Sequence, residues 1–225
     1  MLGAGLEQIE TAENAWYYKR KEKIAAKLIV SFRKFTADVR PERRRLTAQS
    51  EERLCRYCIL FAYLDWIGRN PYGKSALFNM VGYATPNIKK MLSYVDSSVV
   101  ADVVRLSRLF HERHAKLIAN FSKVSTGGIL TGSSDLKADF DLLVDGCLME
   151  IKTTGKAGIA TKYLRQLIGY WLLDYDDTLK IRSFGICLTR HGHTEYFDIR
   201  KDLLRGDKSP AQLRKKFRTE LRKLK

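Results

Sequence analysis

Hydrophobic residues recur every three or four positions through most of the first 121 residues. This spacing places them on one face of a helix. Pro41 marks a break between two such stretches, and Thr47 to Ser50 offers an N-cap for the second. The predicted helices cover residues 9–35, residues from about 50 to 68, the stretch 74–98 with an interruption at Pro86, and residues 98–121, which form the clearest one. The first half of the chain is therefore expected to be helical.

From about residue 135 the hydrophobic period changes to two, which is the period of a β-strand. Residues 136–144 and 147–153 are predicted strands, because they alternate on either side of Asp145-Gly146, a dipeptide typical of two-residue hairpin turns. The other elements expected here are a short strand around Ile129 and Leu130, a helix over residues 161–174, strands over 182–188 and 194–199 joined around His191-Gly192, and an amphipathic basic helix after Pro210.

The order of these elements predicts an α/β fold of the α+β kind, with a mixed sheet flanked by helices. We expect two regions, a helical one over residues 1–97 and a core over residues 98–225 that ends in the basic helix. The composition, 45% apolar and 29% charged residues in a chain of 225, is that of a soluble globular protein. The chain is therefore expected to fold.

Positive charge is in large excess, with 41 Lys and Arg against 25 Asp and Glu and a net charge of +16. Such an excess favours polyanionic partners, of which nucleic acid is the leading candidate. The basic residues cluster at Lys19–Lys23, Arg40–Arg45 and Arg214–Lys225. We expect the last two clusters to bind nucleic-acid backbone, although the tail could instead dock on the body of the protein through Leu213, Phe217, Leu221 and Leu224.

The sequence has no apolar run long enough to span a bilayer and no signal peptide, so we expect a cytoplasmic protein without a membrane partner. Cys55 and Cys58 form a C-x-x-C pair, but no second pair or histidine cluster completes a zinc site. Packing in the core is the better interpretation of these two cysteines.

The hairpin turn determines which residues face each other across the two strands. A two-residue loop pairs Val144 with Cys147, so Asp141 should lie opposite Glu150 and Asp139 opposite Lys152, all four on one sheet face. An ordinary solvated hairpin would also alternate in this way. Two facing carboxylates, however, repel each other unless a cation lies between them. The other face should carry Phe140, Leu142, Val144, Cys147, Met149 and Ile151.

The run from Ala138 to Thr154 resembles the core of the PD-(D/E)XK nuclease superfamily, where an aspartate, an apolar strand and a hairpin precede Glu-x-Lys. Asp141, Glu150 and Lys152 match that pattern here. The proline that usually precedes the aspartate is absent, so Asp139 remains an alternative to Asp141.

Gln166 and Tyr170 are similar to the Gln-x-x-x-Tyr element of the RecB-like branch of this superfamily, and their spacing keeps them on one helix face. The resemblance covers roughly residues 98–199. It implies a restriction-endonuclease-like core to which the helical N-terminal region is added.

The resemblance also implies a metal-dependent nuclease that cuts phosphodiester bonds, with DNA the favoured substrate. Asp141, Glu150 and the backbone carbonyl of Ile151 would hold Mg²⁺ or Mn²⁺. Lys152 would orient or help deprotonate the attacking water, while Gln166 and Tyr170 would position the metal or the strand. A further acidic ligand from the preceding helix is common in the superfamily. Glu112 is the nearest candidate, and an ordinary exposed carboxylate is an equally good interpretation of it.

Two other functions fit the sequence. One is a catalytically silent module that keeps the nuclease fold and binds DNA or scaffolds a complex, and the intact Asp, Glu and Lys count against it. The other is a protein-interaction module that recruits a partner through the helical N-terminal region. Restriction, repair or defence in bacteria or phages is the expected setting, and the sequence allows a dimer without establishing one.

Overall fold

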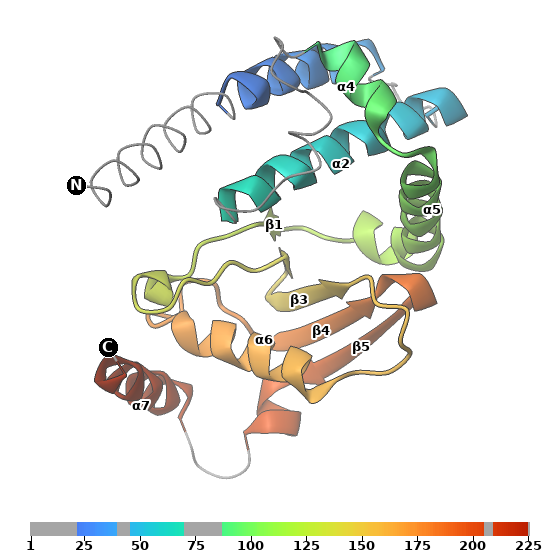
Figure 1. The fold of residues 1–225 in the computed structure, drawn as a ribbon. Coiled ribbons are helices and arrows are strands. Elements are labelled where there is room, and N and C mark those ends of the chain that lie inside the picture. Colours follow the sequence, from blue (N-terminus) through green and yellow to red (C-terminus); the bar gives the residue numbers. More distant parts are fainter. Residues whose placement is uncertain (1–21, 40–45, 70–86, 205–208, 225) are drawn as a thin grey trace, which may run out of the picture. The chain divides into compact units, whose positions relative to one another are not determined.

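The structure is a computed structural model that describes residues 22–39, 46–69, 87–204 and 209–224. The chain divides into two compact units, Met1–Arg105 and Leu106–Lys225, and the boundary falls within the helix α5 (Ser97–Ala119). Figure 1 shows that the first unit is built from helices, whereas the second contains the sheet. The protein is therefore of mixed α/β class.

The first unit packs a helix over residues 22–38, α2 (Ala48–Arg69), α4 (Ile88–Tyr94) and the start of α5 around one apolar cluster. Thr47 caps α2 as predicted, since its Oγ1 accepts the Ser50 amide at 3.2 Å. The Arg56 guanidinium reaches across to the end of α4 and donates to the carbonyl oxygens of Leu92 and Val95, at 3.0 and 2.7 Å. These bonds satisfy acceptors that the helix end leaves without an internal partner.

The second unit is built on a five-stranded mixed sheet with the order β1-β2-β3-β4-β5. All neighbouring strands are antiparallel except β3 and β4, which are parallel and connected by α6. The strands are β1 (Val124–Thr126), β2 (Leu142–Val144), β3 (Cys147–Lys152), β4 (Ser183–Leu188) and β5 (His193–Asp198), and α6 is Thr161–Leu173. The expected mixed sheet with flanking helices is confirmed at this level.

The turn between β2 and β3 has the predicted register, with Val144 opposite Cys147 and Leu142 opposite Met149. Asp145 and Gly146 both have positive φ, 48° and 84°, as a two-residue hairpin turn with the strand twist requires. The Asp145 carboxylate also accepts the amides of Ser122 and Lys123, at 3.1 and 2.8 Å, which fixes the chain that leads into β1.

The antiparallel ladder ends sooner than the sequence pattern predicted. The pairs stop at Leu142, so the predicted strand pairings of Asp141 with Glu150 and of Asp139 with Lys152 are both wrong. Asp139 instead forms an isolated bridge with Ile129. The strand predicted around Ile129 and Leu130 is also misplaced. β1 lies earlier, at Val124–Thr126, and the 3₁₀ turn η1 (Thr131–Ser134) follows.

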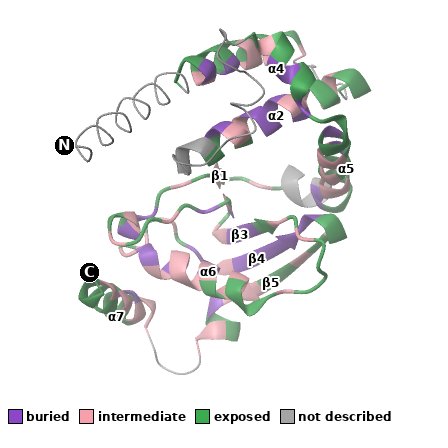
Figure 2. Cartoon of the chain, in the orientation of Figure 1, coloured by how far each residue is buried: buried purple, intermediate pink, exposed green. Residues whose placement is uncertain are grey.

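Each face of the sheet has its own apolar layer. The layer on the α6 side contains Leu143, Leu148 and Leu167, whereas Val144, Met149 and Cys187 belong to a smaller layer on the other side, with Phe110 of α5 packed against it. Figure 2 shows β3 and β4 as largely buried between these layers. Two predicted positions differ. Phe140 packs in the α6 layer, because it precedes the first residue of β2 and does not follow the alternation of the strand. Ile151 is 36% exposed instead of lying in the core.

The basic tail forms α7 (Pro210–Lys223), which packs on α6 through Leu213, Phe217 and Leu221. The alternative in which the tail docks on the protein is therefore confirmed for these three residues, while Leu224 is exposed. Arg214 is buried, and its Nε and Nη2 donate to the Trp171 carbonyl at 3.2 Å and to Asp177 at 2.8 Å.

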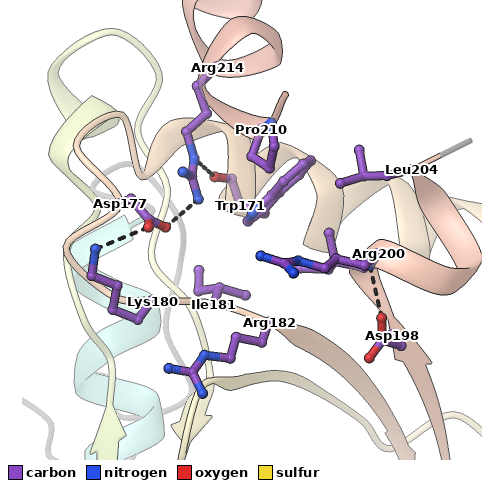
Figure 3. A pocket seen from close by; sticks show the side chains of 11 residues that line it. Trp171, Asp177, Lys180, Ile181, Arg182, Asp198, Arg200, Leu204, Pro210 and Arg214 are labelled. Carbon is purple, nitrogen blue, oxygen red and sulfur yellow. Dashed lines mark hydrogen bonds and ion pairs between the residues drawn. The ribbon is translucent and has the colours of Figure 1, made fainter. Parts of the chain in front are cut away.

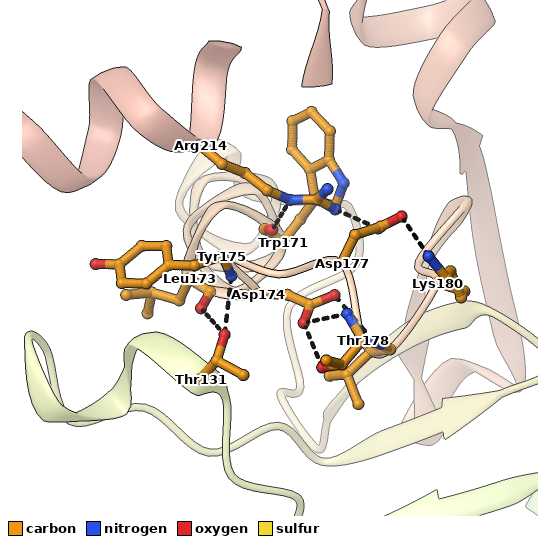
Figure 4. A network of polar contacts seen from close by, with 10 residues as sticks. Thr131, Trp171, Leu173, Asp174, Tyr175, Asp177, Thr178, Lys180 and Arg214 are labelled. Atoms are coloured by element: carbon orange, nitrogen blue, oxygen red, sulfur yellow. Dashed lines mark hydrogen bonds and ion pairs between the residues drawn. The ribbon is translucent and has the colours of Figure 1, made fainter. Parts of the chain in front are cut away.

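A polar network below this contact closes the C-terminal end of α6 (Figure 4). Asp174 is fully buried, and its carboxylate accepts the amides of Thr178 and Leu179, both at 3.1 Å. Thr131 donates to the Leu173 carbonyl and accepts the Tyr175 amide, at 3.2 and 2.9 Å. The loop after α6 is therefore held by hydrogen bonds from two directions.

Several other expectations can be compared with the structure. The predicted hairpin around Gly192 is confirmed as β4 and β5, with Gly192 at φ 57°. Cys55 is buried as expected, whereas Cys58 is exposed. None of the helices in the described ranges is long and apolar enough to cross a membrane. The expectations for residues 9–21, Arg40–Arg45 and residues 70–86 lie outside the described residues.

We predict that Gly146→Ala destabilises the protein, because a Cβ there would lie 2.9 Å from the Lys180 carbonyl oxygen on a backbone with positive φ. The expected loss is about 1–3 kcal/mol in the free energy of unfolding. Gly169→Ala is the control, since nothing lies within 4 Å of a Cβ added at that α6 position. The control should be neutral or stabilise by up to about 1 kcal/mol. Equal effects of both variants in denaturant titrations would contradict this description of the turn.

Candidate active site

The candidate site lies at the C-terminal end of β3, on the side covered by α6. Glu150 and Lys152 alternate with Leu148, which is part of the apolar layer beneath α6. Glu150 is only 2% exposed, and Lys152 is half-buried. Ends of parallel strands beside a crossover helix are common positions for ligand sites in α/β proteins.

Asp141 is positioned by a hydrogen bond to the backbone of β3. On the predicted register Phe140 would face Ile151 across the ladder, but the chain joins the sheet only at Leu142. The Asp141 Oδ2 instead accepts the Ile151 amide at 2.8 Å. The Asp141 side chain thus replaces a backbone partner of β3, and this bond keeps its carboxylate near Glu150.

The Glu150 carboxylate is buried and incompletely satisfied. Its Oε1 accepts a hydrogen bond from the Lys152 ammonium. Its Oε2 is buried and has no hydrogen-bond partner among the described residues. Burial raises the pKa of Glu150 and the charge of nearby Asp141 raises it further, whereas the hydrogen bond and charge of Lys152 and a contact with the Gln166 side chain lower it. This buried carboxylate oxygen therefore lacks the positive partner that such a group ordinarily requires.

Lys152 connects the strand to α6. Its Nζ pairs with Glu150, donates to Gln166 Oε1 at 3.4 Å, and lies 5.1 Å from the centre of the Tyr163 ring. The ring face adds a cation–π attraction to the ion pair. The ammonium is therefore held at the site from three sides.

Gln166 and Tyr170 lie together on the same face of α6, as the four-residue spacing predicts. Gln166 Nε2 donates to the Tyr170 hydroxyl oxygen at 2.6 Å. Burial raises the pKa of Tyr170, the Gln166 bond lowers it, and the charges of Glu150, Asp139 and Asp141 raise it. These influences show that the hydroxyl and the three carboxylates share one electrostatic environment.

Among the predicted residues, the structure brings Asp141, Glu150, Lys152, Gln166 and Tyr170 together around Ile151. Glu112 is not in this group. It is exposed on α5, whose Phe110 packs against the opposite face of the sheet. Asp139 is exposed, and its charge reaches Tyr170. Sequence analysis missed the part played by Tyr163, which lies one turn before Gln166 and could have been found from that spacing.

The donor set is compatible with a hard divalent cation bound by few protein ligands. No group of three or more His, Cys, Asp or Glu side chains suited to a metal occurs in the described part of the chain. Mg²⁺, however, is usually held by one or two carboxylates and keeps several waters. Asp141 and the orphaned oxygen of Glu150 fit that arrangement, and the ordinary preference of Mg²⁺ and Mn²⁺ is for carboxylate oxygen.

Comparisons with protein-family models, with curated proteins and with solved structures found no match for this chain. The functional interpretation therefore rests on the residues of the site.

We predict that the Glu150 carboxylate makes the stability of the protein fall with rising pH. Its folded pKa is raised above the ordinary 4.5, so the folded state holds this proton more tightly than the unfolded chain. The contribution is complete below about pH 4.5 and is lost as the pH rises through the folded pKa. Chemical denaturation of the parent chain and of Glu150→Gln at a series of pH values measures it. A stability difference that does not change with pH would refute the assignment.

Proposed function

We propose that this protein is a metal-dependent nuclease that hydrolyses phosphodiester bonds in nucleic acid, with a core of the PD-(D/E)XK type. The observation that carries the proposal is the buried Glu150 Oε2 without a hydrogen-bond partner, in a carboxylate that lies between Asp141 and Lys152. A purely structural ion pair would be expected to satisfy both carboxylate oxygens, because an unpaired buried charge is costly.

Asp141 and Glu150 would hold Mg²⁺ or Mn²⁺ through their carboxylate oxygens, with the Ile151 carbonyl as a further candidate ligand. The Asp141 hydrogen bond to the Ile151 amide fixes this carboxylate relative to β3 and so prepares the two acids as a pair. When bound, such a cation polarises a phosphate oxygen and makes water a stronger nucleophile near neutral pH.

Lys152 would orient or help to deprotonate the attacking water and would offset negative charge that develops on the phosphate. In the structure its ammonium is held by Glu150, Gln166 and the Tyr163 ring, so it needs no further ordering at the moment of reaction. Gln166 and Tyr170 would keep this shell in place through their mutual hydrogen bond.

The proposed substrate is nucleic acid, with DNA favoured, and the proposed setting is restriction, repair or defence in the cytoplasm. The net charge of +16 supports a polyanionic substrate. On α7, Lys215, Arg218 and Arg222 remain exposed while the apolar side of the helix is docked. This surface could contact phosphates without reading sequence.

One observation favours a second candidate, a silent module that binds DNA without cutting it. Lys152 already neutralises Glu150 in the structure, and an ion pair of this kind can persist in a site that has lost its metal. The two candidates differ in turnover, so they are separated by a cleavage assay with and without metal.

We predict that the parent chain cleaves nucleic acid in Mg²⁺ or Mn²⁺ and is inactive in EDTA. Lys152→Ala and Glu150→Gln should each reduce the rate by at least about 10²-fold, because each removes a charged group from the reacting centre. Lys162→Ala is a matched control, since Lys162 also lies over the Tyr163 ring, at 5.4 Å, but is exposed.

The assay uses plasmid, single-stranded DNA and RNA as separate substrates, with circular dichroism to confirm that each variant is folded. Cleavage by either site variant at the parent rate would contradict the assignment of these residues. If the protein binds Mg²⁺ but cleaves none of the three substrates, the silent module is favoured.

A further inference from the structure

A cavity lies at the opposite end of the strands from the candidate active site. It is lined by the C-terminal part of α6, the loop before β4, the end of β5 with the helical turn η3 (Ile199–Leu203) that follows, and the start of α7, and its volume is about 560 Å³. Cys147 pairs with Ser183 near this end, and Lys152 pairs with Leu188 at the other. At about 3.3 Å per residue the two ends of β3 are roughly 16 Å apart. The cavity is therefore distinct from the catalytic centre.

The lining of this cavity is strongly basic. Four cationic side chains and two carboxylates line it, which leaves a net charge of +2. Figure 3 shows Arg182 and Arg200 extending from different elements around the hollow, with Arg214 and Trp171 above them. The charged residues are Lys180, Arg182, Arg200, Arg214, Asp177 and Asp198.

Both carboxylates accept hydrogen bonds from neighbouring groups. Asp177 accepts from Arg214 Nη2 at 2.8 Å and from Lys180 Nζ at 3.1 Å, one bond on each oxygen. Asp198 accepts the backbone amides of Arg200 and Lys201, both at 2.9 Å. Asp198 also interacts electrostatically with the Arg200 charge, but neither acid forms a hydrogen bond or ion pair with the guanidinium of Arg182 or Arg200 in the described part of the chain.

The guanidinium groups of Arg182 and Arg200 form no hydrogen bond or ion pair with any residue in the described part of the chain. Two cations that face one cavity repel each other, and an anion between them would relieve that repulsion. Guanidinium groups bind phosphate in a bidentate manner, with two parallel N–H donors. Arg214 is only 5% exposed, and its bonds to the Trp171 carbonyl and to Asp177 hold it in the wall of the cavity.

We propose that this cavity binds a phosphate group through Arg182 and Arg200. The inference does not depend on the nuclease proposal, because none of the residues assigned to catalysis lines the cavity. If the protein does cut nucleic acid, the phosphate bound here is a different one from the phosphate that is attacked. The group can come from a nucleic-acid end, from an internal backbone position or from free phosphate.

The test is a titration of the full-length chain in EDTA, followed by NMR, with inorganic phosphate, a 5′-phosphorylated oligonucleotide and the same oligonucleotide without the phosphate. Arg182→Gln combined with Arg200→Gln should weaken phosphate binding by at least about tenfold, as expected for the loss of charge-assisted hydrogen bonds. Lys89→Gln combined with Lys137→Gln removes the same charge from two exposed lysines that neither line the cavity nor belong to the basic clusters, and should leave binding within about twofold.

The three ligands identify the source of the phosphate. A loss confined to the phosphorylated oligonucleotide indicates a terminal phosphate, and an equal loss for both oligonucleotides indicates the backbone. In the latter case the salt dependence of affinity should flatten by about two units of log–log slope. Arg182→Lys with Arg200→Lys should bind with intermediate affinity, because charge is kept while bidentate geometry is lost.

Two results would overturn the proposal: no binding of inorganic phosphate to the parent chain at millimolar concentration, or equal binding by the parent and the Arg-to-Gln double variant. Because the titration needs neither metal nor cleavage, its failure is distinct from a failure of the nuclease proposal.

Discussion

The second unit is organised around one buried carboxylate, that of Glu150. Moving an ion of this kind out of water costs on the order of several kcal/mol, and one lysine hydrogen bond offsets only part of that cost. The remaining oxygen has no donor among the described residues. The apolar layer between the sheet and α6 must therefore offset this cost. Leu148 of β3 and Leu167 of α6 belong to that layer. Such an arrangement is understandable where the group is kept for binding or chemistry.

The parallel pair of β3 and β4 explains why charged groups collect at both ends of the sheet. The crossover through α6 places Gln166 and Tyr170 over the end of β3, and it returns the chain to the start of β4 beside Arg182. α7 then locks the far end of α6 through Arg214. The same helix thus contributes to the candidate active site and to the basic cavity, which a purely antiparallel meander would not bring about.

Local patterns predicted most of the second unit. Asp145-Gly146 determined the register near the turn, and the four-residue spacing of Gln166 and Tyr170 placed both on one face. The period of two failed beyond Leu142, where the backbone leaves the sheet and the Asp141 side chain replaces a backbone partner. The alternation of apolar and polar residues cannot predict that a side chain will take the place of a backbone hydrogen-bond partner. The basic cavity was also beyond prediction, because Arg182, Arg200 and Arg214 come from three separate elements that only the fold brings together.

The most direct test of the central claim is the location of a bound Mn²⁺ ion by paramagnetic broadening of amide NMR signals. A cation held by Asp141 and Glu150 should first broaden the amides of residues 141 and 150–152, and Glu150→Gln should abolish that broadening. Signals around Asp177 and Asp198, which are carboxylates at the opposite end of the sheet, should change little at the same Mn²⁺ concentration. Broadening centred on those two residues, or an unchanged pattern in Glu150→Gln, would contradict the account.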